Sequence, residues 1–304
     1  MRLRGHEPVL LEEAIEGLNI KADGTYLDCT FGRGGHSQRI LQRLGARGRL
    51  LALDRDADAL PHAREISDSR FIFVRSAFSR LSEVLRDNGI AHIEGALLDL
   101  GVSSPQLDDP ARGFSFREDG PLDMRMDQSQ GLSVGEWLAN ASEKEIEEVL
   151  RNHGEERFAK QISRAVVQAR IRAPIRTTRQ LANIVASHVR TRERGQDPAT
   201  RSFQGLRIFI NQELEELSLV LPQIRTALCA FGRLVVISFH SLEDRIVKNF
   251  LREKPDLPEK LPLRAKDIAP PLMREIARVR PSASEITRNP KAKSAVMRIG
   301  ERSA

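Results

Sequence analysis

Two aspartates, Asp54 and Asp99, end apolar runs and stand where chemistry is expected. Asp54 closes "GRLLALD" (48–54), and Asp99 lies in "GALLDL" (95–100), just ahead of Gly, Ser, Pro and two further aspartates. A buried strand emerges from its sheet at this point. A carboxylate there either caps the next segment or is held out to a ligand.

A glycine-rich loop that precedes both aspartates in the sequence indicates what the ligand is. The strand-like "YLDCTF" runs into "GRGGHS", which opens a helix and offers free backbone N–H groups. The dinucleotide fingerprint G-x-G-x-x-G fails here, because Ser37 takes the place of its third glycine. Here an acid, Asp28, comes first instead, and small residues or glycines follow it. They are Thr30, Gly32, Gly34 and Gly35.

Asp54 stands about twenty residues beyond the loop, where a carboxylate accepts the ribose hydroxyls of an adenosine-containing cofactor. Loop and acid together suit S-adenosylmethionine, which presents no pyrophosphate and needs fewer anion-binding amides.

The elements that position these residues alternate in type. Strands are predicted at 25–31, 48–54, 70–74 and 95–100, and helices at 8–18, 36–45, 56–66 and 78–89. This alternation predicts right-handed crossovers and a mainly parallel sheet. The fold class is therefore α/β.

The alternation stops after residue 101. A polar loop spans about residues 102–130, and the helical patterns that follow lie near 133–140, 142–153, 155–171, 177–191 and 203–228. Strands return at 232–239, near 273–280 and near 294–301, with a helix after the first. We predict a domain of residues 1–103 and 229–304, interrupted by a loop and all-helical domain at 104–228.

Composition narrows the class of protein. Of the 304 residues, 40% are hydrophobic and 30% charged, which is ordinary for a globular chain. No run has the length of a membrane span, and "MRLRGHEPVLLEEA" lacks the apolar core of a signal peptide. Cys29 and Cys229 lie far apart, so we expect no metal site and a cytoplasmic location without membrane contact.

Positive charge gathers in two segments. Between Arg151 and Arg207, 13 Lys and Arg stand against 4 Asp and Glu, and from Arg264 onward the counts are 10 and 4. Such segments favour a polyanion partner, although they are also compatible with solvated helix faces.

Longer stretches resemble a known family. They are "HEPVLLEEAIEGL", "YLDCTFGRGGHSQRIL", "LALDRDADAL", "DLGVSSPQLDDPARGFSFREDGPLDMRMD", "ISFHSLEDRIVKNF" and "NPKAKSAVMRIGER". Across essentially its whole length the chain resembles the ribosomal RNA small-subunit methyltransferase H family, also called MraW. The resemblance implies a class I S-adenosylmethionine-dependent methyltransferase sheet with an inserted helical domain. It also implies methylation of N4 of a cytidine in the decoding region of bacterial small-subunit ribosomal RNA.

The resemblance also implies a set of cofactor contacts. Carried over by motif, these are Gly34, Gly35, His36, Asp54, Phe78, Asp99 and Gln106. The ring of Phe78, after the third strand, either covers the adenine or is an ordinary core aromatic.

Asp99 is the predicted catalytic residue. The exocyclic amine of cytosine is a poor nucleophile, so an enzyme helps by hydrogen-bonding and aligning it. Many amino-methyltransferases use Asp/Asn/Ser-Pro-Pro-aromatic after the fourth strand, whereas here Asp99 leads into Leu-Gly-Val-Ser-Ser-Pro-Gln106. Asp99 orients the amine, binds the methionine moiety of the cofactor, or does both. The alternative is a turn cap for Ser103 or Ser104.

Contacts to the RNA are expected from the long loop and the tail. Phe114 and Phe116 are candidate stacking rings or loop anchors, and Arg112, Arg117 and Arg125 are candidate phosphate or base contacts. The remaining candidates are His240, Lys291 and Lys293. Beside His240, "SLED" predicts a capping box in which Ser241 caps the helix and Asp244 completes it.

Three other functions stay open from the residues alone. One is a nicotinamide oxidoreductase, which the broken fingerprint at Ser37 disfavours. The others are a non-catalytic protein that binds RNA and a methyltransferase acting on DNA. The expected partner is small-subunit ribosomal RNA, either naked or in the assembled subunit. A homodimer is compatible with the sequence.

Overall fold

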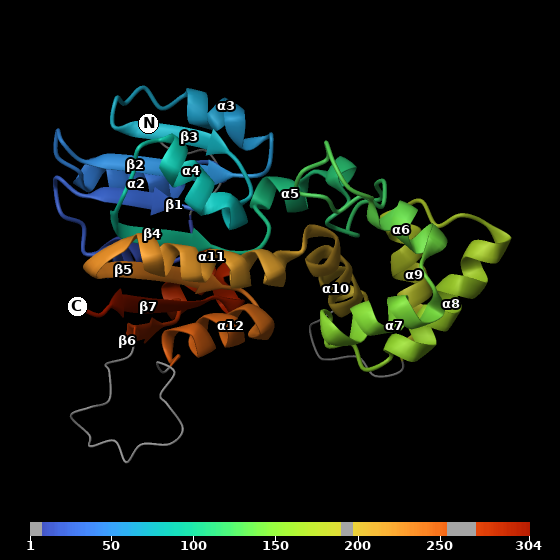
Figure 1. The fold of residues 1–304 in the computed structure, drawn as a ribbon. Coiled ribbons are helices and arrows are strands. Elements are labelled where there is room, and N and C mark those ends of the chain that lie inside the picture. The colour runs from blue at the N-terminus through green and yellow to red at the C-terminus, as the bar shows by residue number, and fades with distance from the viewer. Residues whose placement is uncertain (1–7, 190–196, 254–271) are drawn as a thin grey trace, which may run out of the picture. The chain divides into compact units, whose positions relative to one another are not determined.

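The computed structural model describes residues 8–189, 197–253 and 272–304 (Figure 1). The chain divides into two compact units, Met1–Gly101 with Leu214–Ala304, and Val102–Glu213. The end of the predicted helix 177–191, and Arg264 in the basic tail, lie outside the described residues.

A seven-stranded sheet forms the centre of the first unit, in the order β3-β2-β1-β4-β5-β7-β6. Its strands are β1 (Thr25–Asp28), β2 (Arg49–Asp54), β3 (Phe71–Arg75), β4 (Ile93–Asp99), β5 (Leu228–Ser238), β6 (Met273–Val279) and β7 (Val296–Arg302). The first five are parallel, and β7 runs antiparallel to both β5 and β6. The predicted α/β class with a mainly parallel sheet is confirmed.

Helices cover both faces of this sheet, which explains why its central strands are apolar on both sides. The helices of the first unit are α1 (Leu11–Leu18), α2 (Gly35–Arg43), α3 (Ala59–Arg64), α4 (Leu81–Asp87), α11 (Glu213–Ala227), α12 (Ser241–Leu251) and α13 (Ala283–Arg288). One core lies between the sheet and α4, α11 and α12, and a second lies between the sheet and α1 and α2. In Figure 1, α11 and α12 lie in front of the sheet.

The second unit is helical, with a core of its own. After the short α5 (Ser104–Asp108), its helices are α6 (Val134–Asn140), α7 (Glu143–Asn152), α8 (Ala159–Arg172), α9 (Thr178–His188) and α10 (Thr200–Asn211). Ser133, Ser142 and Thr177 each cap a helix through a reciprocal box with a Glu or Gln three residues on. The predicted all-helical insertion is confirmed.

Two predicted helices differ from those observed. The predicted helix 203–228 is two helices, because Gln212 adopts a left-handed conformation with φ of 53° and separates α10 from α11. The first helix begins at Leu11 rather than Pro8, since Leu10 is also left-handed, with φ of 52°. Leu10 is fully buried, and its N–H donates to Oε1 of Glu285 at 2.7 Å. A distant carboxylate thus sets the start of this helix.

The unit boundary on the carboxyl side falls at residue 213, earlier than the expected 228. The reason lies in α11, whose Leu217, Val220, Leu221 and Ile224 are buried in the core of the first unit. Periodicity identifies such a helix but not the core against which it packs.

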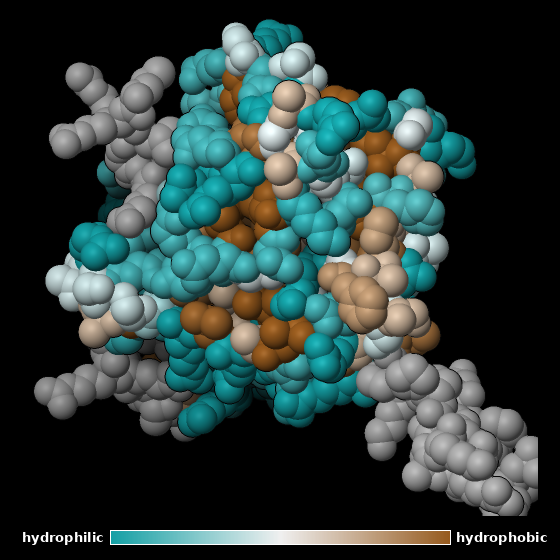
Figure 2. Space-filling model, turned by 90° about the vertical axis from the view of Figure 1, so that its left-hand side faces the viewer, coloured by the Kyte–Doolittle hydropathy of each residue, from teal (hydrophilic) through white to brown (hydrophobic). Residues whose placement is uncertain are grey.

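The surface is mixed in character. On the face drawn in Figure 2, hydrophobic residues appear in patches that hydrophilic residues interrupt. In the described part of the chain, no helix combines the length and the apolar character that crossing a bilayer requires.

Asn211, the last residue of α10, holds the long loop of the helical unit in place. Its Nδ2 donates to the carbonyl of Met124 at 2.7 Å, and its Oδ1 accepts from the N–H of Met126 at 2.8 Å. The side chain is only 2% exposed, so water is a poor substitute for either bond.

We predict that Asn211→Ala lowers the free energy of unfolding of the helical unit by roughly 2–4 kcal/mol, because it removes the partners of one buried and one partly buried backbone group. Urea unfolding followed by the fluorescence of Trp137, the only tryptophan, measures this directly. The matched control is Asn140→Ala, an exposed asparagine that donates to the carbonyl of Glu136. Equal stabilities of the two variants would contradict the role given to Asn211.

Candidate active site

The sheet brings the acidic residues to one edge. Asp28 on β1 pairs with Ala52 of β2 and with Leu97 of β4, so Asp54 and Asp99 occupy the same row two residues further on. The ladder continues past β1, since the N–H of Cys29 donates to Leu97 at 2.9 Å and that of Phe31 to Leu53 at 2.9 Å. Thr30 therefore lies between the two aspartates, which are two strand spacings apart, about 10 Å.

This edge is where ligands bind in doubly wound sheets. The strand order reverses between β1, which continues to β2 and β3, and β4, which continues to β5. The crevice outside the carboxyl ends of strands at such a reversal is the usual ligand site.

The glycine loop is held against β1 by Asp28. Its Oδ2 accepts from Oγ of Ser37 at 2.6 Å, and its Oδ1 accepts from the N–H of Thr30 at 3.1 Å. Ser37 is fully buried, so the residue that breaks the dinucleotide fingerprint has a structural partner of its own. Gly34 caps α2 with φ of 77°, and an added Cβ would lie 2.8 Å from the ring of Phe31. Only glycine fits this position without strain.

Asp54 closes the other side of the loop. Its Oδ2 accepts from the N–H of Gly32 at 2.8 Å, and its Oδ1 accepts from the N–H of Asp56 at 2.8 Å. A carboxylate offers about four lone-pair positions, so each oxygen keeps capacity for a ribose hydroxyl.

Asp99 is the acid with an uncommitted oxygen. Its N–H donates to Oγ1 of Thr30 at 2.7 Å, and its Oδ2 lies 3.8 Å from Nδ1 of the buried His36. Its Oδ1 is buried and has no hydrogen-bond partner among the described residues, although the side chain as a whole is 24% exposed. A buried oxygen without a partner is costly in a folded protein and points to a ligand.

Burial weakens the acidity of all three carboxyl groups, and the nearby Asp28 adds to this effect at Asp54 and Asp99. Burial raises the pKa of Asp28 and of Asp54 to about 6 in each case, against hydrogen bonds that lower it. Burial, with Asp28 and then Glu243 nearby, raises the pKa of Asp99 well above its usual range. A cationic ligand would relieve this cost, because it favours the charged form of each group.

Phe78 and Gln106 occupy different settings. Phe78 begins a short 3-10 helix after β3 and is half-buried against the core next to α4 and α11. In the helical unit, Ser103 caps α5, and Gln106 completes that capping box by accepting from the N–H of Ser103 at 2.8 Å. The partner of the Ser103 N–H is thus Gln106 in the same helix, and not Asp99.

Within the helical unit, most of the proposed RNA contacts are engaged internally. Arg112 is buried, and its guanidinium donates to the carbonyls of Arg125 and Met126 at 3.1 and 3.0 Å. Phe114 is buried, and Phe116 meets Phe203 edge-on at 4.7 Å. Arg125 pairs with Asp123 at 2.7 Å. These contacts favour the alternative in which the rings anchor the loop.

The tail residues are placed by local structure. His240, rather than Ser241, caps α12, and Glu243, rather than Asp244, completes the capping box. The prediction was one residue late, because the helix begins at Ser241 itself. Lys291 and Lys293 are exposed in a short 3-10 helix between α13 and β7.

Two functional details were missed from the sequence. One is the hydroxyl of Thr30, which bridges the loop to the backbone of Asp99, and the other is the buried bond between Ser37 and Asp28. The one sequence signal for either contact was the order of residues in the loop, in which Asp28 precedes the small residues. This order indicates which residues matter but not which partners they bind.

The site fits S-adenosylmethionine. The open glycine turn admits a ligand close to the backbone, Asp54 suits the ribose, and the buried oxygen of Asp99 stands beside the loop. A cluster of carboxyl groups with raised pKa values suits a sulfonium cation. Sheet order, glycine loop and ribose acid together define a class I S-adenosylmethionine-dependent methyltransferase.

Comparison with known proteins gives the family. A model of the MraW methylase family matches residues 4–303. The chain therefore belongs to this family, as its sequence motifs indicated.

Two curated relatives are each 58% identical to this chain, and both are named ribosomal RNA small subunit methyltransferase H. The protein from Herminiimonas arsenicoxydans aligns over 98% of this chain and 94% of its own length. The protein from Dechloromonas aromatica aligns over 99% of each chain.

Among solved structures, an rRNA methylase from Streptococcus thermophilus matches with a TM-score of 0.45 at 9% identity, covering 99% of each chain. Aeropyrum pernix fibrillarin with S-adenosyl-L-methionine matches with a TM-score of 0.41 at 8% identity, covering 95% of this chain and 73% of that one.

We predict that Asp54→Asn weakens binding of S-adenosylmethionine by about tenfold to a hundredfold, because hydrogen bonds to a charged acceptor contribute about 1.5–3 kcal/mol. Titration calorimetry of the purified protein measures this. The control is Asp58→Asn, an exposed position four residues further on. Affinity equal to that of the control would remove Asp54 from the ribose site.

The affinity for S-adenosylmethionine should depend on pH through the carboxyl group of Asp54. Since the pKa of Asp54 is about 6, its carboxylate is lost as the pH falls from 7.5 to 5.5, and affinity should fall with it. Asp54→Asn should flatten part of this dependence. In the absence of ligand the sign for stability is opposite. The folded chain holds this proton more tightly than the unfolded chain, so the contribution of Asp54 to stability falls as the pH rises from about 4 to about 6.

Proposed function

We propose that the chain methylates small-subunit ribosomal RNA, at N4 of a cytidine in the decoding region. The curated relatives, 58% identical over nearly the whole chain, carry the name of a small-subunit ribosomal RNA methyltransferase. The base and its location follow from the resemblance described above. The observation that carries the proposal is the buried, uncommitted Oδ1 of Asp99 beside the glycine loop, an acceptor suited to an exocyclic amine.

The proposed mechanism depends on alignment by Asp99. When bound, S-adenosylmethionine supplies a methyl group on a positively charged sulfur. Oδ1 of Asp99 accepts a hydrogen bond from the cytosine amine and turns its lone pair toward the cofactor side of the site. Thr30 holds the aspartate by its backbone N–H, and Nδ1 of His36 lies 3.8 Å from its second oxygen. Because its pKa is raised, Asp99 also receives the proton that the amine loses.

The helical unit is proposed to recognise the RNA. Its α8 and α9 region carries exposed basic side chains, which are Arg157, Lys160, Arg164, Arg172, Arg176 and Arg179. Contacts from such residues to phosphates bind RNA without reading its sequence. Specificity for a folded site would then come from shape.

The protein is proposed to act in the cytoplasm. Cys29 and Cys229 are both free thiols, as expected in a reducing compartment. The predicted homodimer stays a prediction.

Nucleoside mass spectrometry of ribosomal RNA from cells with and without the gene tests the substrate. We expect N4-methylcytidine at one small-subunit position to disappear in the deletion strain and to return on complementation. An unchanged level would refute the specific substrate while leaving the cofactor assignment standing.

The two rival classes are distinguished by purified protein. A nicotinamide oxidoreductase would bind NAD, whereas we expect saturable binding of S-adenosylmethionine alone. A non-catalytic RNA-binding protein would bind the RNA but never transfer a labelled methyl group to it.

We predict that Asp99→Ala lowers kcat for RNA methylation by about a hundredfold or more, because the amine loses its orienting acceptor. Asp87→Ala, which removes an exposed aspartate at the end of α4, serves as the control. A single-turnover assay with labelled cofactor separates this effect from binding. Near-normal methylation by Asp99→Ala would end the catalytic assignment. If only the affinity for the cofactor fell, Asp99 would be a cofactor ligand alone.

A further inference from the structure

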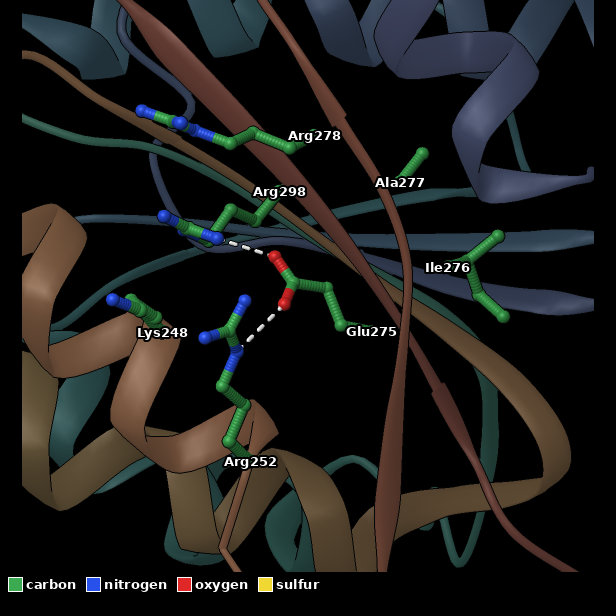
Figure 3. Close-up of a pocket in the computed structure, with 7 residues that line it drawn as sticks. All are labelled: Lys248, Arg252, Glu275, Ile276, Ala277, Arg278 and Arg298. Carbon is green, nitrogen blue, oxygen red and sulfur yellow. Dashed lines mark hydrogen bonds and ion pairs between the residues drawn. The ribbon is translucent and has the colours of Figure 1, made fainter.

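A basic pocket of about 380 Å³ lies between α12 and β6, which is the last strand on one side of the sheet. Its lining is Lys248, Arg252, Glu275, Ile276, Ala277, Arg278 and Arg298 (Figure 3). Four of these seven residues are cationic and one is acidic. None of them belongs to the glycine loop or to the row of Asp54 and Asp99.

Two of the cations, Arg298 and Arg252, form ion pairs within the protein. Arg298 is almost fully buried and binds Asp244 of α12 through two bonds of 2.7 and 2.9 Å. It also pairs with Glu275, which accepts from Nε of Arg252 at 3.0 Å. These bonds fix the floor of the pocket, since each carboxylate is held by arginine.

The other two cations, Lys248 and Arg278, form no hydrogen bond and no ion pair with any of the described residues. Both act on Asp244 only at longer range, and together with Arg298 they help to lower its pKa. In Figure 3 the charged ends of Lys248, Arg278 and Arg298 lie on the same side of β6, while Ile276 and Ala277 point the other way. With Asp244 counted, the pocket carries four positive and two negative charges.

Strand register connects this pocket to the active site. Val279 of β6 pairs with Met297 of β7, Met297 with Ile237 of β5, and Ile237 with Asp99 of β4. β6 runs parallel to β5, so its carboxyl end lies on the edge that presents Asp99. Three strand spacings separate them, about 14 Å, and Arg278 is one row below.

We propose that this pocket holds a backbone phosphate of the RNA, a few nucleotides from the target base. The pocket has more cations than anions, and Lys248 and Arg278 have no carboxylate partner among the described residues, so the pocket favours an anionic ligand. A polynucleotide whose base reaches Asp99, and whose backbone continues along this edge toward β6, passes the pocket. Guanidinium and ammonium groups on a fixed floor are suited to a phosphodiester. The inference rests on the proposed function, because it takes RNA as the substrate.

The test compares two double variants with the same loss of charge. Lys248→Gln/Arg278→Gln alters the pocket. Arg47→Gln/Arg86→Gln alters exposed arginines near the amino ends of β2 and β4, at the opposite edge of the sheet. Binding is measured over a salt series with two probes, naked small-subunit ribosomal RNA and assembled subunits from the deletion strain.

We expect the pocket variant to bind its RNA probe about tenfold more weakly than the control, with the slope of log K against log [salt] reduced by about one to two. Affinity for S-adenosylmethionine and the unfolding temperature should stay close to those of the wild-type chain, since neither residue lies in the glycine loop or itself forms an ion pair with a described residue. A salt slope equal to that of the control on both probes would overturn the proposal. So would weaker binding confined to assembled subunits without a change of slope, which would assign the pocket to a protein.

This outcome is separable from that of the proposed function. A wild-type chain that binds RNA but methylates none would refute the function, yet the salt slopes would still decide whether the pocket holds a phosphate. Normal methylation with unchanged slopes would refute the pocket alone.

Discussion

The active edge depends on one chain of hydrogen bonds centred on the buried carboxyl group of Asp28. It binds the hydroxyl of Ser37 on α2 and the backbone of Thr30, while the hydroxyl of Thr30 in turn accepts from the N–H of Asp99. The loop and the start of α2 are thereby held in one geometry with the end of β4, which is distant in sequence. In a dry setting each such bond is strong and each broken one is expensive, so the loop, α2 and the end of β4 are coupled.

The cost of this arrangement is electrostatic. Three acids, Asp28, Asp54 and Asp99, gather at one edge with little solvent, and burial raises the pKa of each. A structure that needed only stability would favour fewer buried charges. A binding site for a cationic cofactor has a reason to keep them, because the ligand's charge relieves the repulsion and adds to affinity. The raised pKa of Asp99 also suits the role of proton acceptor that we propose for it.

Exposed basic side chains gather on elements other than those that carry the three acids. They lie on α8 and α9 in one unit, and around Lys248 and Arg278 in the other. Under the proposed function, a small cationic cofactor and a polyanionic substrate meet surfaces of opposite sign on one chain.

The sequence by itself determined the α/β class, the helical insertion and the acids at strand ends, because these depend on periodicity and on the rule that parallel strands end at a common edge. It also excluded the dinucleotide loop, through Ser37. Only the tertiary structure decided which polar groups have partners. Arg112 and Phe114 were candidate RNA contacts in the sequence but are buried in the helical core, and His240 replaced Ser241 as the cap of α12. The basic pocket went unseen, because Arg278 and Arg298 come from β6 and β7, whereas Lys248 and Arg252 come from α12 and its carboxyl end. Local patterns record spacing along the chain, whereas burial and pairing depend on the register between segments that meet only after folding.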